Sequence, residues 1–159
     1  MTKLLLSVHV LVAILTVGSI TVAASMFPRH ALRAFGGERP GGRPEGIGTA
    51  VILHRICCGY ALAGVAVPVF GIATGAQLGV LTDAWLIVSL VLTTIAAALL
   101  GLAVLPGQRR LLALAEDAAG EEAARPVAAR LTMLTGVFNV LWAVVVVLMI
   151  VRPGSTTSA

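Results

Sequence analysis

Long apolar stretches alternate along this chain with short segments that hold its charges, its prolines and many of its glycines. Four stretches, residues 4–27, 49–74, 84–105 and 131–151, are each long enough to cross a bilayer. A transmembrane α-helix needs about 20 apolar residues, because each residue rises about 1.5 Å through a hydrocarbon core about 30 Å thick. The pattern predicts an all-α, polytopic membrane protein whose four transmembrane helices form a bundle.

The first stretch allows a second interpretation. It is uncharged, it ends at Pro28, and Val22-Ala23-Ala24 within it resembles a signal-peptide cleavage site. Its apolar length, however, exceeds the roughly 7–15 residues of a typical signal-peptide core. The sequence therefore favours a retained membrane helix over a leader that is removed.

The segments between the stretches differ in character. Residues 28–48 combine arginines with many glycines and prolines, which is typical of an irregular loop. Residues 108–130 begin with Arg109 and Arg110, continue with leucines and alanines and then become acidic. That pattern predicts a short amphipathic helix at the membrane interface between the third and fourth spans. Residues 155–159 are expected to form a disordered tail, which leaves residues 1–154 as a single transmembrane domain.

Lysine and arginine are distributed unevenly along the chain. Nine of the 11 lie in the first and third connectors, if Arg55 at the start of the second span is included, whereas Lys3 and Arg152 lie near the termini. Because cytoplasmic segments of membrane proteins are enriched in these residues, we expect both connectors in the cytoplasm and both termini outside. The predominance of arginine over lysine, with abundant alanine and glycine, is typical of a GC-rich bacterial genome. We therefore expect the bacterial cytoplasmic (inner) membrane.

Composition supports the membrane assignment and excludes an ordinary soluble domain. The chain is 58% hydrophobic and 11% charged, against about 45–50% and 25% in soluble proteins. Its net charge of +4 is compatible with a nucleic-acid partner. The basic residues follow the connectors, however, and aromatic residues are few, so we expect no binding to nucleic acid.

Small and weakly polar residues recur on one face of three predicted helices. In lipid, helices associate through close contact and hydrogen bonds, because the surroundings are as apolar as the helices themselves. The residues predicted to pack against neighbouring helices are Gly64, Pro68 and Gly71 in the second span, Ser89 and Thr93 in the third, and Gly136 and Asn139 in the fourth. The Asn139 amide should face another helix, where its hydrogen bond would contribute about 1 kcal/mol.

His9 and His54 invite a chemical hypothesis, since histidines on two helices commonly hold haem. The two residues lie near opposite ends of their spans, about 15 Å apart along the membrane normal at about 1.5 Å per residue. This separation excludes ligation of one haem by both. His9 is expected either to hydrogen-bond within the bundle, for example to Thr16, or to contact haem, a quinone or a metal. His54 is expected to anchor the cytoplasmic interface beside Arg55.

Other candidate residues receive structural interpretations. Cys57 and Cys58 are adjacent, which is not the spacing of a metal site, so we expect them to fill space in the bundle. Copper binding would need a third ligand. Trp142 is expected to pack between helices. The predicted lipid-interface residues are Arg55, Trp85, Arg109 and Arg110.

Four short segments resemble a family of small bacterial four-helix membrane proteins known only as a domain of unknown function. The segments are residues 3–11 (KLLLSVHVL), 85–90 (WLIVSL), 105–111 (LPGQRRL) and 148–153 (LMIVRP). That family is loosely similar to copper-resistance membrane proteins, but this chain lacks their paired histidines and methionine-rich segments. The resemblance implies a four-helix topology with His9 as the family-like polar residue, and it implies no activity.

The spans contain no grouping of acid, base and nucleophile, so we expect a protein that is not an enzyme and holds no metal. The leading hypothesis is an accessory or structural subunit that contacts lipids and either other membrane proteins or a second copy of itself. The alternative is a redox protein in which His9 contacts haem or a quinone. A small transporter or channel comes third, because no aspartate, glutamate or lysine lies within a span and such groups usually mark transport pathways.

Overall fold

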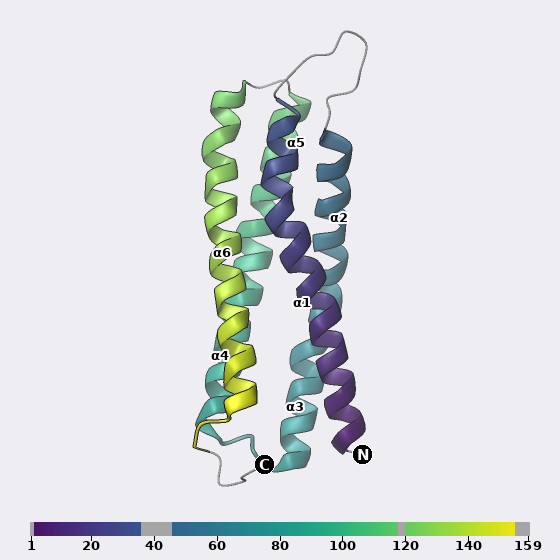
Figure 1. The fold of residues 1–159 in the computed structure, drawn as a ribbon, viewed down its shortest axis with the longest axis vertical. Helices are drawn as coiled ribbons and strands as arrows, with labels where there is room; N and C mark the ends of the chain where they lie inside the picture. The colour runs from purple at the N-terminus through teal and green to yellow at the C-terminus, as the bar shows by residue number, and fades with distance from the viewer. Residues whose placement is uncertain (1, 36–45, 118–119, 155–159) are drawn as a thin grey trace.

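The computed structural model describes residues 2–35, 46–117 and 120–154, which are helical apart from short turns (Figure 1). The helical segments are α1 (Thr2–Arg33), α2 (Ile47–Gly64), α3 (Ala66–Leu78), α4 (Ala84–Leu99), the π-helical segment η1 (Leu100–Val104), α5 (Leu105–Glu116) and α6 (Glu121–Val151). α2 runs almost directly into α3, and α4 continues through η1 into α5. The described chain therefore consists of long rods joined at their ends.

Four of these rods are long and apolar enough to span a membrane, namely α1, Ile47–Leu78, Ala84–Glu116 and α6. They run alternately in opposite directions, so that both termini lie at one end of the bundle (Figure 1). α1 packs along α2, α3 and α6, while α6 also packs against α4 and α5. The predicted all-α bundle of four transmembrane helices is confirmed, and the chain is a multi-pass membrane protein.

The main hydrophobic core lies in the half of the bundle away from the termini. α1 contributes Ile20, Ala24, Phe27 and Ala31, which are spaced three or four residues apart and therefore share one face of the helix. They pack with buried residues of α2, α5 and α6, several of which are alanines. Small side chains let helix axes approach closely. The half near the termini instead contains a pocket.

α1 continues through Pro28 to Arg33, so the helix runs beyond the predicted apolar span of residues 4–27. A proline inside a helix removes one backbone hydrogen bond, but membrane helices tolerate this loss where the surrounding structure compensates for it. Pro28 is buried, as are Phe27 and Ala31 next to it. Packing against the other helices thus keeps the chain helical where local sequence favours a stop.

The short amphipathic helix predicted between the third and fourth spans is present as α5, but it continues the third span directly. Residues 105–116 form α5, which continues the third rod, and α6 already begins at Glu121. The junction is the π-helical segment, where the amide of Leu105 donates to the carbonyl of Leu100, five residues earlier. Gln108 and Leu111 of α5 are buried against the bundle.

The second rod is interrupted between α2 and α3. Pro68 has no amide hydrogen to donate to the carbonyl of Gly64, four residues earlier. Just before this position, the amide of Val65 donates to the carbonyl of Leu62, three residues earlier, at 3.2 Å. The predicted tail, residues 155–159, and most of the first connector, residues 36–45, lie outside the described residues.

Candidate functional site

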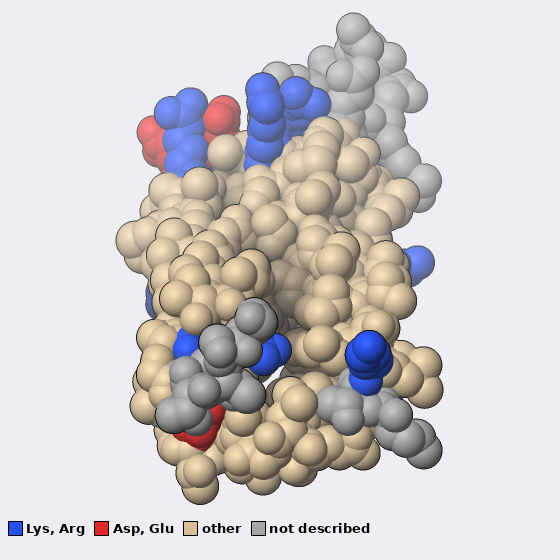
Figure 2. All heavy atoms as spheres, turned by 60° about the horizontal axis from the view of Figure 1, so that its bottom comes forward, with Lys and Arg blue, Asp and Glu red and all other residues tan. Residues whose placement is uncertain are grey.

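A pocket of about 480 Å³ lies between α1, α3, α4 and α6 at the end of the bundle that holds the termini. Its walls are mainly apolar side chains from all four rods, such as Leu6, Ile14, Leu86 and Val146. Figure 2, which brings this end forward, shows a hollow between the helices with basic side chains near its edge. We call it the His9 pocket, because His9 supplies a polar group to its wall.

His9 is held in one orientation by a backbone contact across the bundle. The residue is 7% exposed, and Nδ1 lies 3.0 Å from the carbonyl oxygen of Val67 at the start of α3. A carbonyl oxygen only accepts hydrogen bonds, so Nδ1 carries the hydrogen and donates it. In the neutral ring, Nε2 then keeps a lone pair. His9 can therefore offer Nε2 to a hydrogen-bond donor or to a metal.

The predicted bond from His9 to Thr16 is wrong. The Thr16 hydroxyl donates to the carbonyl of Val12 within α1, at 2.6 Å. Residues seven apart lie on one face of a helix but about 10 Å apart along its axis, since each residue rises about 1.5 Å. The sequence did not show that the break before α3 would bring the Val67 carbonyl to the ring.

Gly71 makes room for the His9 ring. A Cβ atom built at Gly71 would lie 3.1 Å from Cε1 of His9, which is closer than an ordinary van der Waals contact. α3 can therefore approach α1 at this level because position 71 has no side chain. Gly71 is one of the residues predicted to pack against a neighbouring helix, and its neighbour there is the candidate functional histidine.

The opposite wall of the His9 pocket contains Trp85 and Arg152. The Trp85 indole N–H donates to a carboxylate oxygen of Asp83 at 3.0 Å, and the Arg152 guanidinium carbon lies 5.6 Å from the centre of the ring system. This is within the distance for a cation–π contact. Trp85 is only 7% exposed, so the prediction that it faces the lipid interface is wrong. The two polar partners and the bundle interior together hold the indole inward.

A second polar group of residues lies between α2 and α5, in the other half of the bundle. His54 Nδ1 is 2.8 Å from the Gln108 side-chain oxygen, and the Gln108 amide nitrogen is 3.6 Å from the Cys57 sulfur. The Cys58 sulfur is 3.5 Å from His54 Nε2. His54 therefore points into the bundle, and its predicted role as an anchor at the cytoplasmic interface is wrong.

Gln108 is the residue of this group that the sequence analysis missed. It is 1% exposed, although it directly precedes Arg109 and Arg110 and was assigned to a polar segment. Gln108 follows Val104 by four residues and precedes Leu111 by three, so the three residues share one face of the helix. This spacing is the signal in the sequence that could have identified Gln108 as buried. Within the described residues, no three histidine, cysteine or acidic side chains gather as a metal centre would require.

The predicted packing residues fall into two groups. Ser89 is fully buried, Thr93 is 9% exposed, and Pro68 is partly buried. A Cβ built at Gly64 or Gly136, by contrast, would meet nothing within 4 Å. Neither glycine brings two helices together inside this bundle, so that prediction is wrong for both. Periodicity shows that residues share a face, but it does not show which face is inside.

Asn139 does face another helix, because its side-chain nitrogen lies 3.4 Å from the Ser25 hydroxyl of α1. The contact is long for a hydrogen bond. Three buried polar atoms on α6 have no described hydrogen-bond partner: the Asn139 side-chain oxygen, the Thr135 hydroxyl and the Trp142 indole nitrogen. Trp142 also packs edge-on against Phe138, with ring centres 6.3 Å apart.

These features define the class of the protein: a multi-pass helical membrane protein with a histidine-lined pocket between its helices. No family model, curated protein or solved structure matches the chain. The resemblance to a bacterial domain of unknown function therefore stays a prediction. Arg55, Arg109 and Arg110 are exposed, and their position at a membrane interface stays a prediction.

Proposed function

We propose that this protein is not an enzyme and that it binds a lipophilic molecule in the His9 pocket. The observation that carries the proposal is a buried histidine whose Nδ1 is fixed by the Val67 carbonyl while its ring lines a pocket of about 480 Å³. Small-molecule sites commonly have volumes of about 300–1,000 Å³, apolar walls and a few convergent polar groups. The His9 pocket has this combination.

The proposed ligand is a membrane quinol or quinone. The Nε2 lone pair of the neutral ring accepts a hydrogen bond from a quinol hydroxyl, whereas the protonated ring donates one to a quinone carbonyl. Apolar walls suit the ring and the isoprenoid chain of such a molecule. Haem is the alternative, because axial histidines are commonly oriented by a hydrogen bond from the other ring nitrogen. Met149, which would supply a second ligand to haem, lines the same pocket.

Charge supports an orientation in which both termini, and with them the His9 pocket, face the outer side of a bacterial inner membrane. The end with the termini carries Lys3 and Arg152, whereas the opposite end carries six arginines of the described chain. Those are Arg29, Arg33, Arg109, Arg110, Arg125 and Arg130. Cytoplasmic ends of membrane helices are enriched in such residues. In this orientation the ligand would enter from the outer leaflet.

The test is to purify the protein in mild detergent from a host that makes quinones, then to extract the preparation with organic solvent. We expect a colourless protein that retains quinone in near-stoichiometric amount, and a His9→Leu variant that loses it. Thr16→Val is the matched control, since it alters a buried polar residue of α1 that bonds only within its own helix. A Soret band that is present in the unaltered protein and absent from His9→Leu would show that the ligand is haem and not a quinone. A preparation with neither ligand would contradict the proposal.

The accessory-subunit role is a second candidate, and the outer face of α6 favours it. Thr132, Gly136 and Ala143 are exposed there, with open space around Gly136. Small residues on a lipid-facing surface let a further helix approach. If a partner helix binds this face, Gly136→Leu should remove a copurifying membrane protein or a second copy of the chain. Gly101→Leu, at another exposed glycine, should leave it in place.

A further inference from the structure

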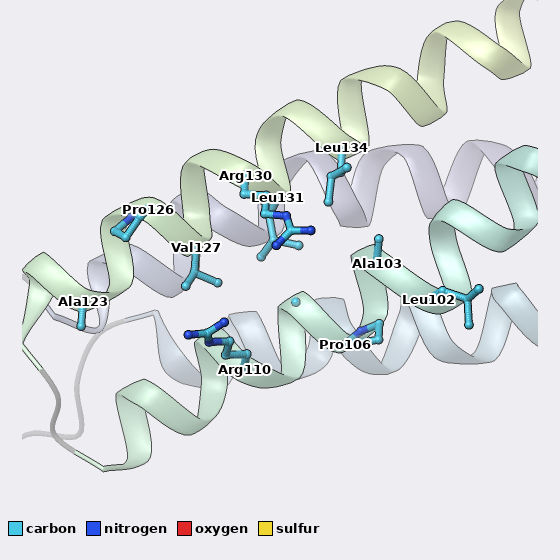
Figure 3. Close-up of a pocket in the computed structure, with 11 residues that line it drawn as sticks. Leu102, Ala103, Pro106, Arg110, Ala123, Pro126, Val127, Arg130, Leu131 and Leu134 are labelled. Carbon is cyan, nitrogen blue, oxygen red and sulfur yellow. The ribbon is translucent and has the colours of Figure 1, made fainter.

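A second hollow, of about 430 Å³, lies between α5 and α6 at the end of the bundle away from the termini (Figure 3). Gly107 and Leu131 bring the two helices together at its floor, where a Cβ built at Gly107 would lie 2.8 Å from a Leu131 methyl carbon. On either side of this contact the helices leave a groove. We call it the α5–α6 groove.

Two arginines from different helices converge on this groove. Arg110 of α5 and Arg130 of α6 both line it, and Figure 3 shows their side chains extending into the space between the helices. Both are exposed. In the part of the chain that the structure describes, the ion pair found is Arg125 with Glu121, at 3.1 Å. Within the described residues, neither groove arginine forms an ion pair with a carboxylate.

The remaining wall of the groove is apolar and continues toward the middle of the bundle. Leu102 and Leu134 line it on that side, and both belong to stretches that cross the membrane. Leu102 lies eight residues before Arg110, which corresponds to about 12 Å along a helix. The groove is therefore cationic at its polar end and apolar at its membrane end.

We propose that the α5–α6 groove binds one anionic phospholipid. The planar guanidinium of arginine binds phosphate oxygens through paired hydrogen bonds, so Arg110 and Arg130 would hold the headgroup from two sides. An acyl chain would lie along Leu102 and Leu134. Basic pockets between transmembrane helices on the cytoplasmic side bind anionic headgroups. Free phosphate would satisfy the arginines but would leave the apolar wall unused.

The test compares phospholipids on the full-length protein in delipidated detergent solution. We expect phosphatidylglycerol to bind, by native mass spectrometry, about tenfold more tightly than phosphatidylcholine. Arg110→Gln with Arg130→Gln should remove this preference. Arg55→Gln with Arg109→Gln is the matched control, because it removes the same charge from exposed arginines that do not line the groove, and it should keep the preference.

Two further arms make the result decisive even if the double variant folds poorly. In the unaltered protein, the preference for phosphatidylglycerol should weaken as salt rises, because exposed charges are screened. Inorganic phosphate at the same concentration should not raise the unfolding temperature as the phospholipid does. Three results would each overturn the proposal. The two phospholipids bind equally well, both double variants lose the preference for phosphatidylglycerol equally, or phosphate raises the unfolding temperature as much as the phospholipid does.

Discussion

His9 owes its orientation to one backbone carbonyl and to one absent side chain. The Val67 carbonyl fixes Nδ1, and position 71 leaves the ring its space. His9 was identified from the sequence because a histidine in an apolar span is unusual. Its partner was not, since a backbone carbonyl has no sequence signature. Gln108 was missed because Arg109 and Arg110 follow it in the chain, whereas its own side chain is buried in the bundle.

Gly71→Ala should weaken ligand binding in the His9 pocket with little effect on folding. The new methyl group would lie 3.1 Å from Cε1 of His9, so the ring must shift by a few tenths of an ångström and lose its alignment. The helix itself gains roughly 0.5–1 kcal/mol from replacing glycine by alanine. Quinone retention and thermal unfolding would be measured on the same preparation.

Gly18→Ala is the control for this substitution, because a Cβ at Gly18 meets nothing within 4 Å. It should stabilise the helix and keep the ligand. Full ligand retention in Gly71→Ala would show that the position of the His9 ring does not govern binding.

Asn139→Leu should raise the thermal stability of the bundle. The side-chain oxygen of Asn139 is buried without a described partner, and its nitrogen makes one long contact to Ser25. An unsatisfied buried polar atom costs roughly 1–3 kcal/mol, more than interhelical hydrogen bonds in membranes usually contribute, about 0.6 kcal/mol. A lower unfolding temperature would mean that Asn139 has a partner such as a bound water.

At the scale of the helices, hydropathy predicted how many rods cross the membrane but not where they end. The sequence placed the ends of the first and third spans at Pro28 and Leu105, yet helix continues to Arg33 and Glu116. Hydropathy measures transfer of side chains into lipid, whereas a helix ends where its backbone hydrogen bonds stop. Packing of α5 against α2 and α6 extends the third rod beyond its apolar part.

The π-helical segment accommodates one more residue than an α-helical turn would. Deleting Gly101 should therefore convert η1 to α-helix, leave the orientation of α5 unchanged and alter stability by about 1 kcal/mol or less. Gly101 is exposed with open space around it. Deleting Val140, an exposed residue of the regular helix α6, should prevent folding, because half of that helix would rotate by about 100°. Equal tolerance of both deletions would contradict this role of η1.

Across the whole molecule, the two ends of the bundle differ in packing and in charge. The end near the termini contains the His9 pocket, and the other end contains the main core and most of the arginines. Membrane class and helix number could be predicted from the sequence because they depend on the summed hydropathy of each stretch. The pocket could not, because it depends on side chains from four helices whose rotations the apolar pattern leaves open.

The orientation predicts that alkaline phosphatase fused after Ala159 is active, since this reporter folds only outside the cytoplasm, where disulfides form. The same reporter fused after Asp117, at the opposite end of the bundle, should be inactive. The reverse pattern would place the arginine-rich end outside and invert the orientation.

Binding in the His9 pocket can be measured directly by the fluorescence of Trp85, which lines it. The chain has two tryptophans, so a Trp142→Phe protein in phosphatidylcholine nanodiscs reports on Trp85 alone. Titration with a short-chain benzoquinol, whose hydroxyl can donate to the Nε2 lone pair of His9, should quench this fluorescence to saturation. His9→Leu should weaken the apparent affinity by about five- to tenfold, the value of one hydrogen bond. Quenching that rises without saturation and is identical in His9→Leu would contradict binding in the His9 pocket.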